Sequence, residues 1–189
     1  CRPFVQVATY LEQMGLNAPR VLASDLERGF LLLTDLGTEQ YLDRLPEDRD
    51  ALYTAAVDAL LAIAERGDEF REALPPYDTA LLSFEMSLFH EWFLTRQLGL
   101  VLSGAERQML QSLYDLLVRS ALAQPTGFVH RDYHCRNLLE TDENNPGIID
   151  FQDAVIGPVT YDLVSLYKDC YYRFERDVVV ARVTGFASL

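Results

Sequence analysis

Positive charge is scarce in this sequence. Lysine and arginine together number 16 against 29 aspartates and glutamates, which gives a formal net charge of −13 at pH 7. Because nucleic-acid surfaces are bound through clusters of lysine and arginine, this balance argues against a nucleic-acid partner. It leaves a nucleotide site open, since a bound Mg²⁺ would supply positive charge locally.

Long apolar runs and paired cysteines are also lacking. No run approaches the length of a transmembrane helix and no signal peptide is visible, so we expect no membrane partner. The three cysteines, Cys1, Cys135 and Cys170, are odd in number and form no C-x-x-C motif. Such usage is typical of free thiols in a reducing cytoplasm, where we expect the protein to act.

The remaining composition is that of a globular protein. The chain has 189 residues, of which 49% are hydrophobic, which is enough for a core in one or two small domains. The sequence begins with cysteine in place of methionine and ends abruptly at residues 185–189. We therefore expect both ends to belong to a longer protein.

The residues with the most chemistry lie in a single stretch in the second half of the chain. His130, Arg131 and Asp132 follow a short apolar run, Asn137 comes after four intervening residues, and Asp150 follows a second apolar run. The polar segment between the two runs predicts a turn. The pattern is therefore strand, loop, strand, turn, strand, with acids and an amide at the strand ends.

This spacing is typical of a phosphoryl-transfer site. Asp132 on the loop can accept a hydroxyl proton, while Asn137 and Asp150 offer the hard oxygen ligands that Mg²⁺ prefers. The pattern fits the protein-kinase signature, except that Gln152 stands where that signature has glycine after Asp150 and Phe151. The alternative is a polar β-hairpin in which the aspartates and the asparagine cap turns.

Other polar residues of the loop are further candidates. We expect His130 to brace the loop, because His134 lies on the same loop and a zinc site made from these two with Cys135 would lack a fourth ligand. His134 and Arg136 are candidates to face substrate or phosphate.

Three acids that follow the loop are further candidates for the site. Asp153 is either a sugar-binding or supporting acid, or a turn cap. Asp162 either lies in the first turn of a helix, where the dipole favours a carboxylate, or binds back to the catalytic loop and fixes Asp132. Asp169 belongs to a polar and aromatic side of the same helix that could face a sugar.

The rest of the chain predicts helices and one strand pair. Apolar periodicity predicts helices at residues 3–14, 48–66, 78–97, 103–123 and 162–182, and antiparallel strands at residues 20–24 and 30–34. Asp78 and Ser103 are the expected caps of the third and fourth helices. Large apolar side chains on these two helices are expected to be buried, with a pocket wall as the alternative for the aromatic ones: Phe84, Phe89, Trp92, Phe93, Met109, Leu113, Leu116 and Leu117.

The motifs resemble those of the aminoglycoside phosphotransferase family, which has a protein-kinase-like fold. The resemblance rests on residues 130–138 and 149–166, with support from residues 30–37 and 88–94, and it covers most of residues 3–175. More narrowly, these strings are similar to one branch, the bacterial kinases that phosphorylate the anomeric hydroxyl of N-acetylmuramate and N-acetylglucosamine in cell-wall recycling.

The resemblance implies an α+β, two-lobed fold and an ATP- and Mg²⁺-dependent phosphotransferase. Residues 1–37 would be a partial N-terminal lobe of helix, two strands and hinge, and residues 38–189 a mainly helical C-terminal lobe. In the site, the resemblance implies that Asp132 is the catalytic base, that Asn137 and Asp150 bind Mg²⁺, that the backbone of Thr34, Asp35 and Leu36 meets adenine, and that Asp162 braces the loop. Taken without the resemblance, Thr34–Leu36 would be a plain strand-ending turn.

Two departures from the family pattern are visible. The family has a phosphate-covering loop and a strand lysine before its first helix, and neither is in this sequence. We therefore expect the 189 residues by themselves not to turn over ATP. The alternatives for the function are another acceptor, such as an aminoglycoside, a choline-like alcohol, homoserine or methylthioribose, or a non-catalytic nucleotide-binding module.

Overall fold

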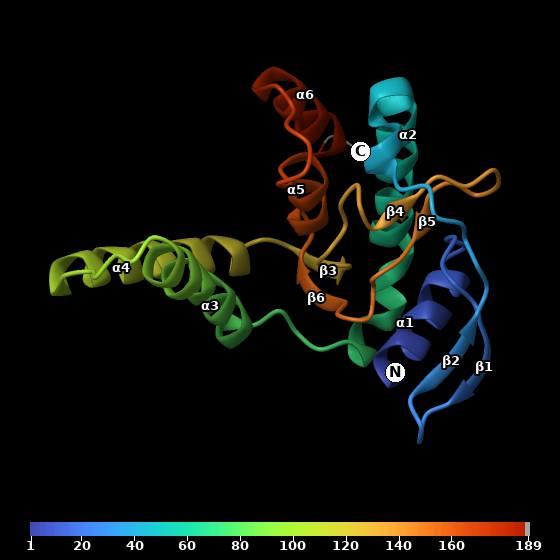
Figure 1. Cartoon of the computed structure of the whole chain (residues 1–189), viewed down its shortest axis with the longest axis horizontal. Coiled ribbons are helices and arrows are strands. Elements are labelled where there is room, and N and C mark those ends of the chain that lie inside the picture. The colour runs from blue at the N-terminus through green and yellow to red at the C-terminus, as the bar shows by residue number, and fades with distance from the viewer. Residues whose placement is uncertain (188–189) are drawn as a thin grey trace.

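The first elements of the chain form a helix and a hairpin. The computed structural model describes residues 1–187, beginning with helix α1 (Arg2–Gln13) and the antiparallel strands β1 (Val21–Asp25) and β2 (Phe30–Leu33) (Figure 1). A proline in the first turn of α1 suits its start, because the missing N–H would have no partner there. The predicted helix and strand pair are confirmed.

A long helix, α2 (Tyr41–Arg66), is the centre of the larger part of the molecule (Figure 1). It is kinked at Asp48, whose φ/ψ of −135°/29° is not helical. The predicted helix at residues 48–66 is therefore the longer of two helical segments that join at this kink. One face of α2 is buried in the main core, together with α1, α5 and the strands of the site.

Two short strand pairs frame the candidate site. β3 (Thr126–Val129) pairs antiparallel with β6 (Val155–Pro158), and β4 (Leu138–Leu139) pairs antiparallel with β5 (Gly147–Ile148). The predicted order of strand, loop, strand, turn and strand is confirmed. The catalytic-type loop connects β3 to β4, and Asp150 follows β5, so both come to the same region of the body.

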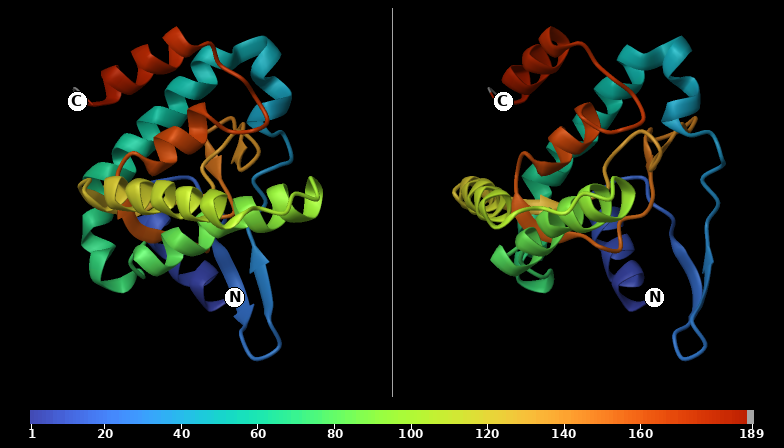
Figure 2. Two further views of the ribbon diagram at one scale, coloured as in Figure 1. Left: turned by 90° about the vertical axis from the view of Figure 1, so that its left-hand side faces the viewer. Right: turned by 60° about the vertical axis from the view of Figure 1, so that its left-hand side comes forward.

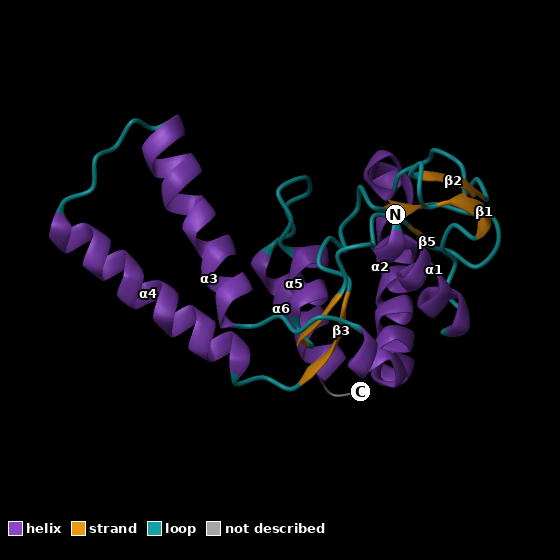
Figure 3. Cartoon of the chain, turned by 90° about the horizontal axis from the view of Figure 1, so that it is seen from below, coloured by secondary structure: helices purple, strands orange, loops and turns teal. Residues whose placement is uncertain are grey.

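The helices of the middle section leave this body as an arm (Figures 1 and 3). The arm consists of α3 (Thr79–Leu88), a π-helical continuation η2 (Phe89–Gln97) and α4 (Gly104–Leu122), and it is joined to α2 through the 3₁₀ segment η1 (Gly67–Ala73). The predicted caps are confirmed: Asp78 accepts from the amide of Leu81, and Ser103 forms a capping box with Glu106.

The expected burial of the arm's apolar side chains is wrong. The turned views in Figure 2 show α4 lying across the molecule with much of its length away from α2. Because the two arm helices pack mainly on each other, one side of each is left open to solvent. The exposed set includes Phe84 (60%), Trp92 (55%) and Met109 (69%), with Phe89, Phe93, Leu113, Leu116 and Leu117 between 44% and 55%.

The single helix expected at residues 162–182 is also wrong. The structure has α5 (Tyr161–Tyr167), a break, and then α6 (Arg176–Ala187). The break has a physical cause, since one carboxylate oxygen of Asp169 accepts hydrogen bonds from the amides of Tyr171 and Tyr172, which turns the chain. The last two residues of the expected C-terminal lobe, 188–189, lie outside the described residues. None of the described helices is both long and apolar enough to cross a bilayer.

Candidate active site

A buried carboxylate holds the start of the catalytic-type loop. Asp162, 4% exposed on α5, accepts the backbone N–H of His130 at 2.7 Å and that of Arg131 at 3.0 Å. Burial raises the pKa of Asp162 to about 7, against the opposing effect of these two hydrogen bonds. The contact fits the second interpretation of Asp162, a carboxylate that reaches back to the loop.

His130 connects the loop to the strand that carries Asp150. Its Nδ1 accepts the backbone N–H of Asp132 at 3.3 Å, so its Nε2 carries the proton and donates to the carbonyl oxygen of Ile149 at 3.1 Å. Complete burial lowers the pKa of His130 to about 4, which keeps the ring neutral. These contacts are those of a loop-bracing residue.

The three residues expected to carry the chemistry meet at one place. Asn137 Nδ2 donates to the carbonyl oxygen of Asp132 at 3.0 Å and to Asp150 Oδ2 at 3.3 Å. Asp150 has a positive φ of 62°, and its second oxygen accepts from Gln152 Nε2 at 2.7 Å. Strained backbone at a non-glycine residue persists only where the surroundings hold it, and such residues gather at functional sites.

The charges at this place affect one another. Burial, followed by the nearby charge of Asp150, raises the pKa of Asp132. A carboxyl whose pKa lies above its ordinary value is a better proton acceptor while it is ionised, so the arrangement suits a general base.

The donor set fits a magnesium ion. With Nδ2 engaged, Asn137 offers its Oδ1, and Asp150 offers a carboxylate beside it, which together give two hard oxygen ligands. Among residues 1–187 there is no group of three His, Cys, Asp or Glu side chains that could hold a metal, so the zinc site from His130, His134 and Cys135 is not formed. Mg²⁺ is often held by only one or two protein ligands, with water and phosphate completing its shell.

Sequence reasoning missed an aromatic contact behind Asp150. Phe151 is fully buried, and its ring centroid lies 4.7 Å from that of Phe4 on α1. The contact ties the first helix of the chain to the residue that follows Asp150. The only signal in the sequence was the aromatic residue near the start of the α1 apolar stripe.

The three hinge candidates, Thr34, Asp35 and Leu36, directly follow β2. Thr34 pairs with Arg20 through its backbone and its hydroxyl, and Asp35 Oδ1 accepts the N–H of Gly37 at 2.9 Å. Leu36 packs on β5, where a Cβ added to Gly147 would lie 3.2 Å from Leu36 Cδ1. A cavity of about 760 Å³ is lined by all three hinge candidates, and within residues 1–187 the amides of Asp35 and Leu36 make no hydrogen bond.

The structure divides the remaining candidates between a pocket and the surface. A cavity of about 510 Å³ is lined by His134 and Asp169, with Tyr161, Lys168 and Tyr171. The centroid of the His134 ring lies 5.1 Å from that of Tyr171.

Arg136 and Asp153 line neither of these two cavities, and Asp169, which lines one of them, also binds a cysteine. Arg136 lies over the ring of Tyr171, with 5.0 Å from its guanidinium carbon to the ring centroid. Asp153 is exposed and touches the loop through its carbonyl oxygen, which accepts from Arg131 at 3.4 Å. Asp169 also accepts the thiol of Cys135 at 3.2 Å, and burial raises the pKa of this thiol to about 12, which leaves it unreactive.

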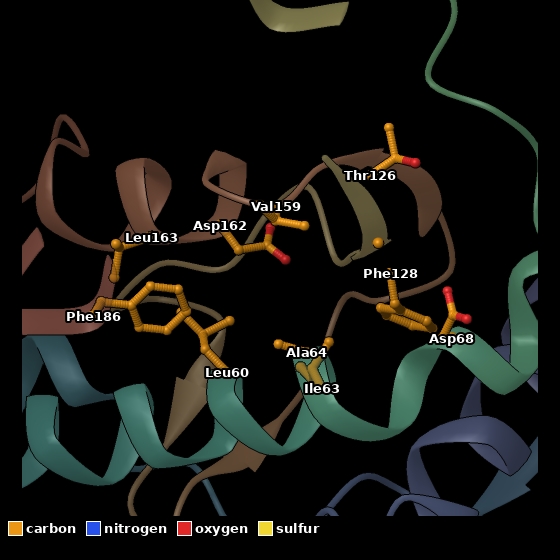
Figure 4. Close-up of a pocket in the computed structure, with 11 residues that line it drawn as sticks. Leu60, Ile63, Ala64, Asp68, Thr126, Phe128, Val159, Asp162, Leu163 and Phe186 are labelled. Carbon is orange, nitrogen blue, oxygen red and sulfur yellow. The ribbon is translucent and has the colours of Figure 1, made fainter. Parts of the chain in front are cut away.

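A third cavity lies behind the loop, and neither Asp132 nor Asp150 lines it. It measures about 160 Å³ and is lined mainly by apolar side chains of α2, β3, α5 and α6, together with two acids, Asp68 and Asp162 (Figure 4). Each of these acids already has a partner, because both oxygens of Asp162 accept from the loop amides and Asp68 is paired with Arg71.

Comparison with known proteins identifies the family of the chain. The model of the phosphotransferase enzyme family matches residues 1–187. The chain belongs to the phosphotransferase enzyme family. The resemblance seen in the sequence is confirmed.

Two relatives of the chain share one name. The chain is 52% identical over 187 residues to the N-acetylmuramate/N-acetylglucosamine kinase of Pseudomonas aeruginosa, with 98% of this chain and 54% of that protein covered. It is 47% identical to the protein of the same name from Pseudomonas putida, with 98% and 53% covered. The chain therefore spans about half the length of these relatives.

Solved structures of the family share the fold. An ADP-bound aminoglycoside phosphotransferase, APH(2'')-Ib, matches with a TM-score of 0.69 at 15% identity, covering 98% of this chain and 66% of that one. Choline kinase LicA from Streptococcus pneumoniae matches with a TM-score of 0.68 at 13% identity, covering 98% and 61%. The expected α+β, protein-kinase-like fold is confirmed.

Proposed function

We propose that the protein containing this chain transfers the γ-phosphate of ATP to the anomeric hydroxyl of N-acetylmuramate or N-acetylglucosamine. Its product would be a sugar 1-phosphate made in the cytoplasm during peptidoglycan recycling. The observation that carries the proposal is the meeting of Asp132, Asn137 and Asp150 at one place. The names of relatives 52% and 47% identical to the chain support the choice of acceptor.

Asp132 is the base in this proposal. It accepts or orients the hydroxyl proton of the sugar, and its raised pKa makes it a stronger acceptor than an exposed aspartate. Phosphoryl transfer involves little covalent chemistry by the protein, so positioning and charge neutralisation supply most of the rate. Asp162 and His130 provide that positioning for the loop.

Asn137 and Asp150 would hold Mg²⁺. When bound, the ion neutralises the charge of the nucleotide phosphates. The contribution of the protein is to keep the two oxygen donors together, which it does through the hydrogen bond between the side chains of Asn137 and Asp150 at 3.3 Å. Nucleotides in related structures, ADP in one of them, support the use of a nucleotide donor.

The adenine is proposed to meet the backbone of Thr34, Asp35 and Leu36. An unpaired amide of Asp35 or Leu36 would donate to a ring nitrogen of the purine, and a backbone carbonyl oxygen of the same segment would accept from its exocyclic amine. The packing of Leu36 on β5 supports the proposal, because Asp150 comes two residues after that strand.

The acceptor is proposed to occupy the cavity of about 510 Å³ beside the loop. Its lining combines aromatic rings with polar groups, as sugars require: Tyr161 and Tyr171 supply the rings, and Lys168 supplies a cation for the carboxylate of N-acetylmuramate. His134 supports the assignment, because its buried Nδ1 has no hydrogen-bond partner in the described part of the chain.

A second candidate is a phosphotransferase of the same family with another alcohol as acceptor. Aminoglycosides are polycations, and the net charge of −13 suits such a substrate. An assay of ADP release distinguishes these two functions. The full-length protein would be given Mg-ATP with N-acetylmuramate, N-acetylglucosamine, kanamycin or choline. Release with the amino sugars supports the proposal, and release only with kanamycin or choline overturns the choice of acceptor. Tight nucleotide binding without release would favour a non-catalytic module.

A further inference from the structure

A carboxylate on the arm joins two side chains of the body. Glu85 lies on α3, and its Oε1 accepts from Arg131 Nη2 while its Oε2 accepts from the hydroxyl of Tyr77. The side chains of Glu85 and Arg131 are each only 22% exposed, and Tyr77 is 2% exposed. Hydrogen bonds to a charged group are stronger than neutral ones, and partial burial limits their screening by salt.

Tyr77 is a fixed anchor for this carboxylate. Its amide donates to the carbonyl oxygen of Ile156 on β6 at 2.8 Å, and its ring packs edge-on against Tyr161 at 5.3 Å between centroids. The backbone beneath the ring admits only glycine, because a Cβ added to Gly157 would lie 2.8 Å from Tyr77 Cδ1. Glu85 is therefore held against the strand pair next to the catalytic loop.

Arg131 is the residue immediately before Asp132, and its backbone is strained. It has a φ of 79°, which is rare for a non-glycine residue. Asp162 holds its backbone N–H at 3.0 Å, while Glu85 holds its guanidinium group. The position of the peptide that leads to Asp132 is thus fixed by two carboxylates from two different helices.

We propose that Glu85 is a positioning residue for phosphoryl transfer, which acts on Asp132 through Arg131 and at the same time sets the place of α3. On that helix, Leu82 and Met86 line the proposed acceptor cavity on either side of Glu85 in the sequence. The carboxylate of Glu85 therefore sets the distance between α3, which forms part of the cavity wall, and the proposed base, Asp132. This inference rests on the proposed function.

The test compares Glu85→Gln with Glu91→Gln in the full-length protein. Glu85→Gln keeps the shape of the side chain but removes its charge, so kcat should fall about 10- to 100-fold, as small misplacements of reacting groups do. KM for ATP should stay within about twofold, because neither Glu85 nor Arg131 lines the cavity at the proposed adenine site. Glu91 is an exposed glutamate of η2 on the same arm, and its variant should keep kcat within about twofold.

Tyr77→Phe provides a second variant in case Glu85→Gln folds poorly. It keeps the ring that packs on Tyr161 and Gly157 and removes only the hydroxyl that Glu85 accepts. Because the ion pair with Arg131 remains, kcat should fall by a smaller factor, about three- to tenfold.

Hydrogen exchange gives a readout that does not depend on the acceptor. In Glu85→Gln, the amides of residues 130–137 should exchange about tenfold faster than in the wild type or in Glu91→Gln, since one of two anchors of the loop is lost. If the wild type phosphorylates no amino sugar, the proposed function fails while this readout still tests Glu85. Unchanged kcat and unchanged exchange in both Glu85→Gln and Tyr77→Phe would overturn the inference.

Discussion

His130 donates its backbone N–H to Asp162 Oδ2 at 2.7 Å, and both residues are buried. The pair places a carboxylate and an imidazole at the start of the catalytic loop without access to water. Burial opposes charge on each of them, so it raises the pKa of the acid and lowers the pKa of the base. Their effects on the pH dependence of stability therefore have opposite signs.

Asp162→Asn should remove a contribution to the free energy of unfolding that decreases as pH rises. The pKa of Asp162 is about 7 in the folded protein and roughly 4 when unfolded. Between these values the folded state binds a proton that the unfolded state does not, so this stabilisation is complete below pH 4 and is lost up to pH 7. The free energy of unfolding of the full-length wild type, relative to Asp162→Asn, should fall by roughly 2–3 kcal/mol from pH 5 to pH 8. A constant difference across this range contradicts the assignment.

His130→Asn should show the opposite trend. The pKa of His130 is about 4 when folded and roughly 6.5 when unfolded, so its neutral, buried form contributes stability above pH 6.5 that is lost as pH falls toward 4. The wild type should lose stability relative to His130→Asn when denaturant unfolding is measured at pH 5 instead of pH 7. His90 lies on the arm and is partly exposed, and His90→Asn serves as the matched control for replacing a histidine.

Asp132→Asn should lower kcat about 10²- to 10⁴-fold, the range expected when a general base is removed. The substitution keeps the size of the side chain, so nucleotide binding should be unchanged. The matched control is Asp153→Asn, an exposed aspartate nearby whose contact with the loop uses only its backbone. A loss in Asp132→Asn much smaller than tenfold in steady-state ADP release would remove Asp132 from the role of base.

Asp150→Ala should raise the Mg²⁺ concentration that gives half-maximal rate. Removing one of two protein ligands weakens the site, so the loss of activity should be largest at low Mg²⁺ and partly recovered at high Mg²⁺. Asp142→Ala, at an exposed aspartate in the turn between β4 and β5, is the control. An unchanged Mg²⁺ dependence in a titration of the Asp150 variant would show that Asp150 is not a ligand.

The contact between Phe4 and Phe151 should appear as a coupling in stability. Aromatic pairs at such separations contribute about 0.5–1.5 kcal/mol beyond the burial of their area. A double-mutant cycle with Phe4→Leu and Phe151→Leu, followed by denaturant unfolding, should give a coupling energy in this range. Additive effects of the two substitutions would show that α1 is not tied to the Asp150 segment through these rings.

The sequence was most informative where local spacing decides structure. Asp132, Asn137 and Asp150 lie at strand ends, and strands of two to four residues bring them together through pairing that turn residues already indicate. The caps at Asp78 and Ser103 were likewise predictable, because a cap depends on residues only three positions apart.

The errors arose where structure depends on distant partners. An apolar stripe such as Met109 and Leu116 shows that a helix has an apolar face, but not whether another element covers it in this chain. The break after α5 depends on the side chain of Asp169 reaching amides two and three residues ahead, which helical periodicity does not detect. The contacts of Glu85 with Arg131 and Tyr77 join segments 46 and 8 residues apart, and no spacing rule predicts the first of these.

The measurement that tests the central claim most directly is phosphorus NMR of the reaction product. The full-length protein would be incubated with Mg-ATP and N-acetylmuramate or N-acetylglucosamine, with Asp132→Asn as the control. We expect a new phosphomonoester signal coupled to the anomeric proton, absent with the variant. A signal coupled to another sugar position, or an equal signal with Asp132→Asn, would contradict the proposed function.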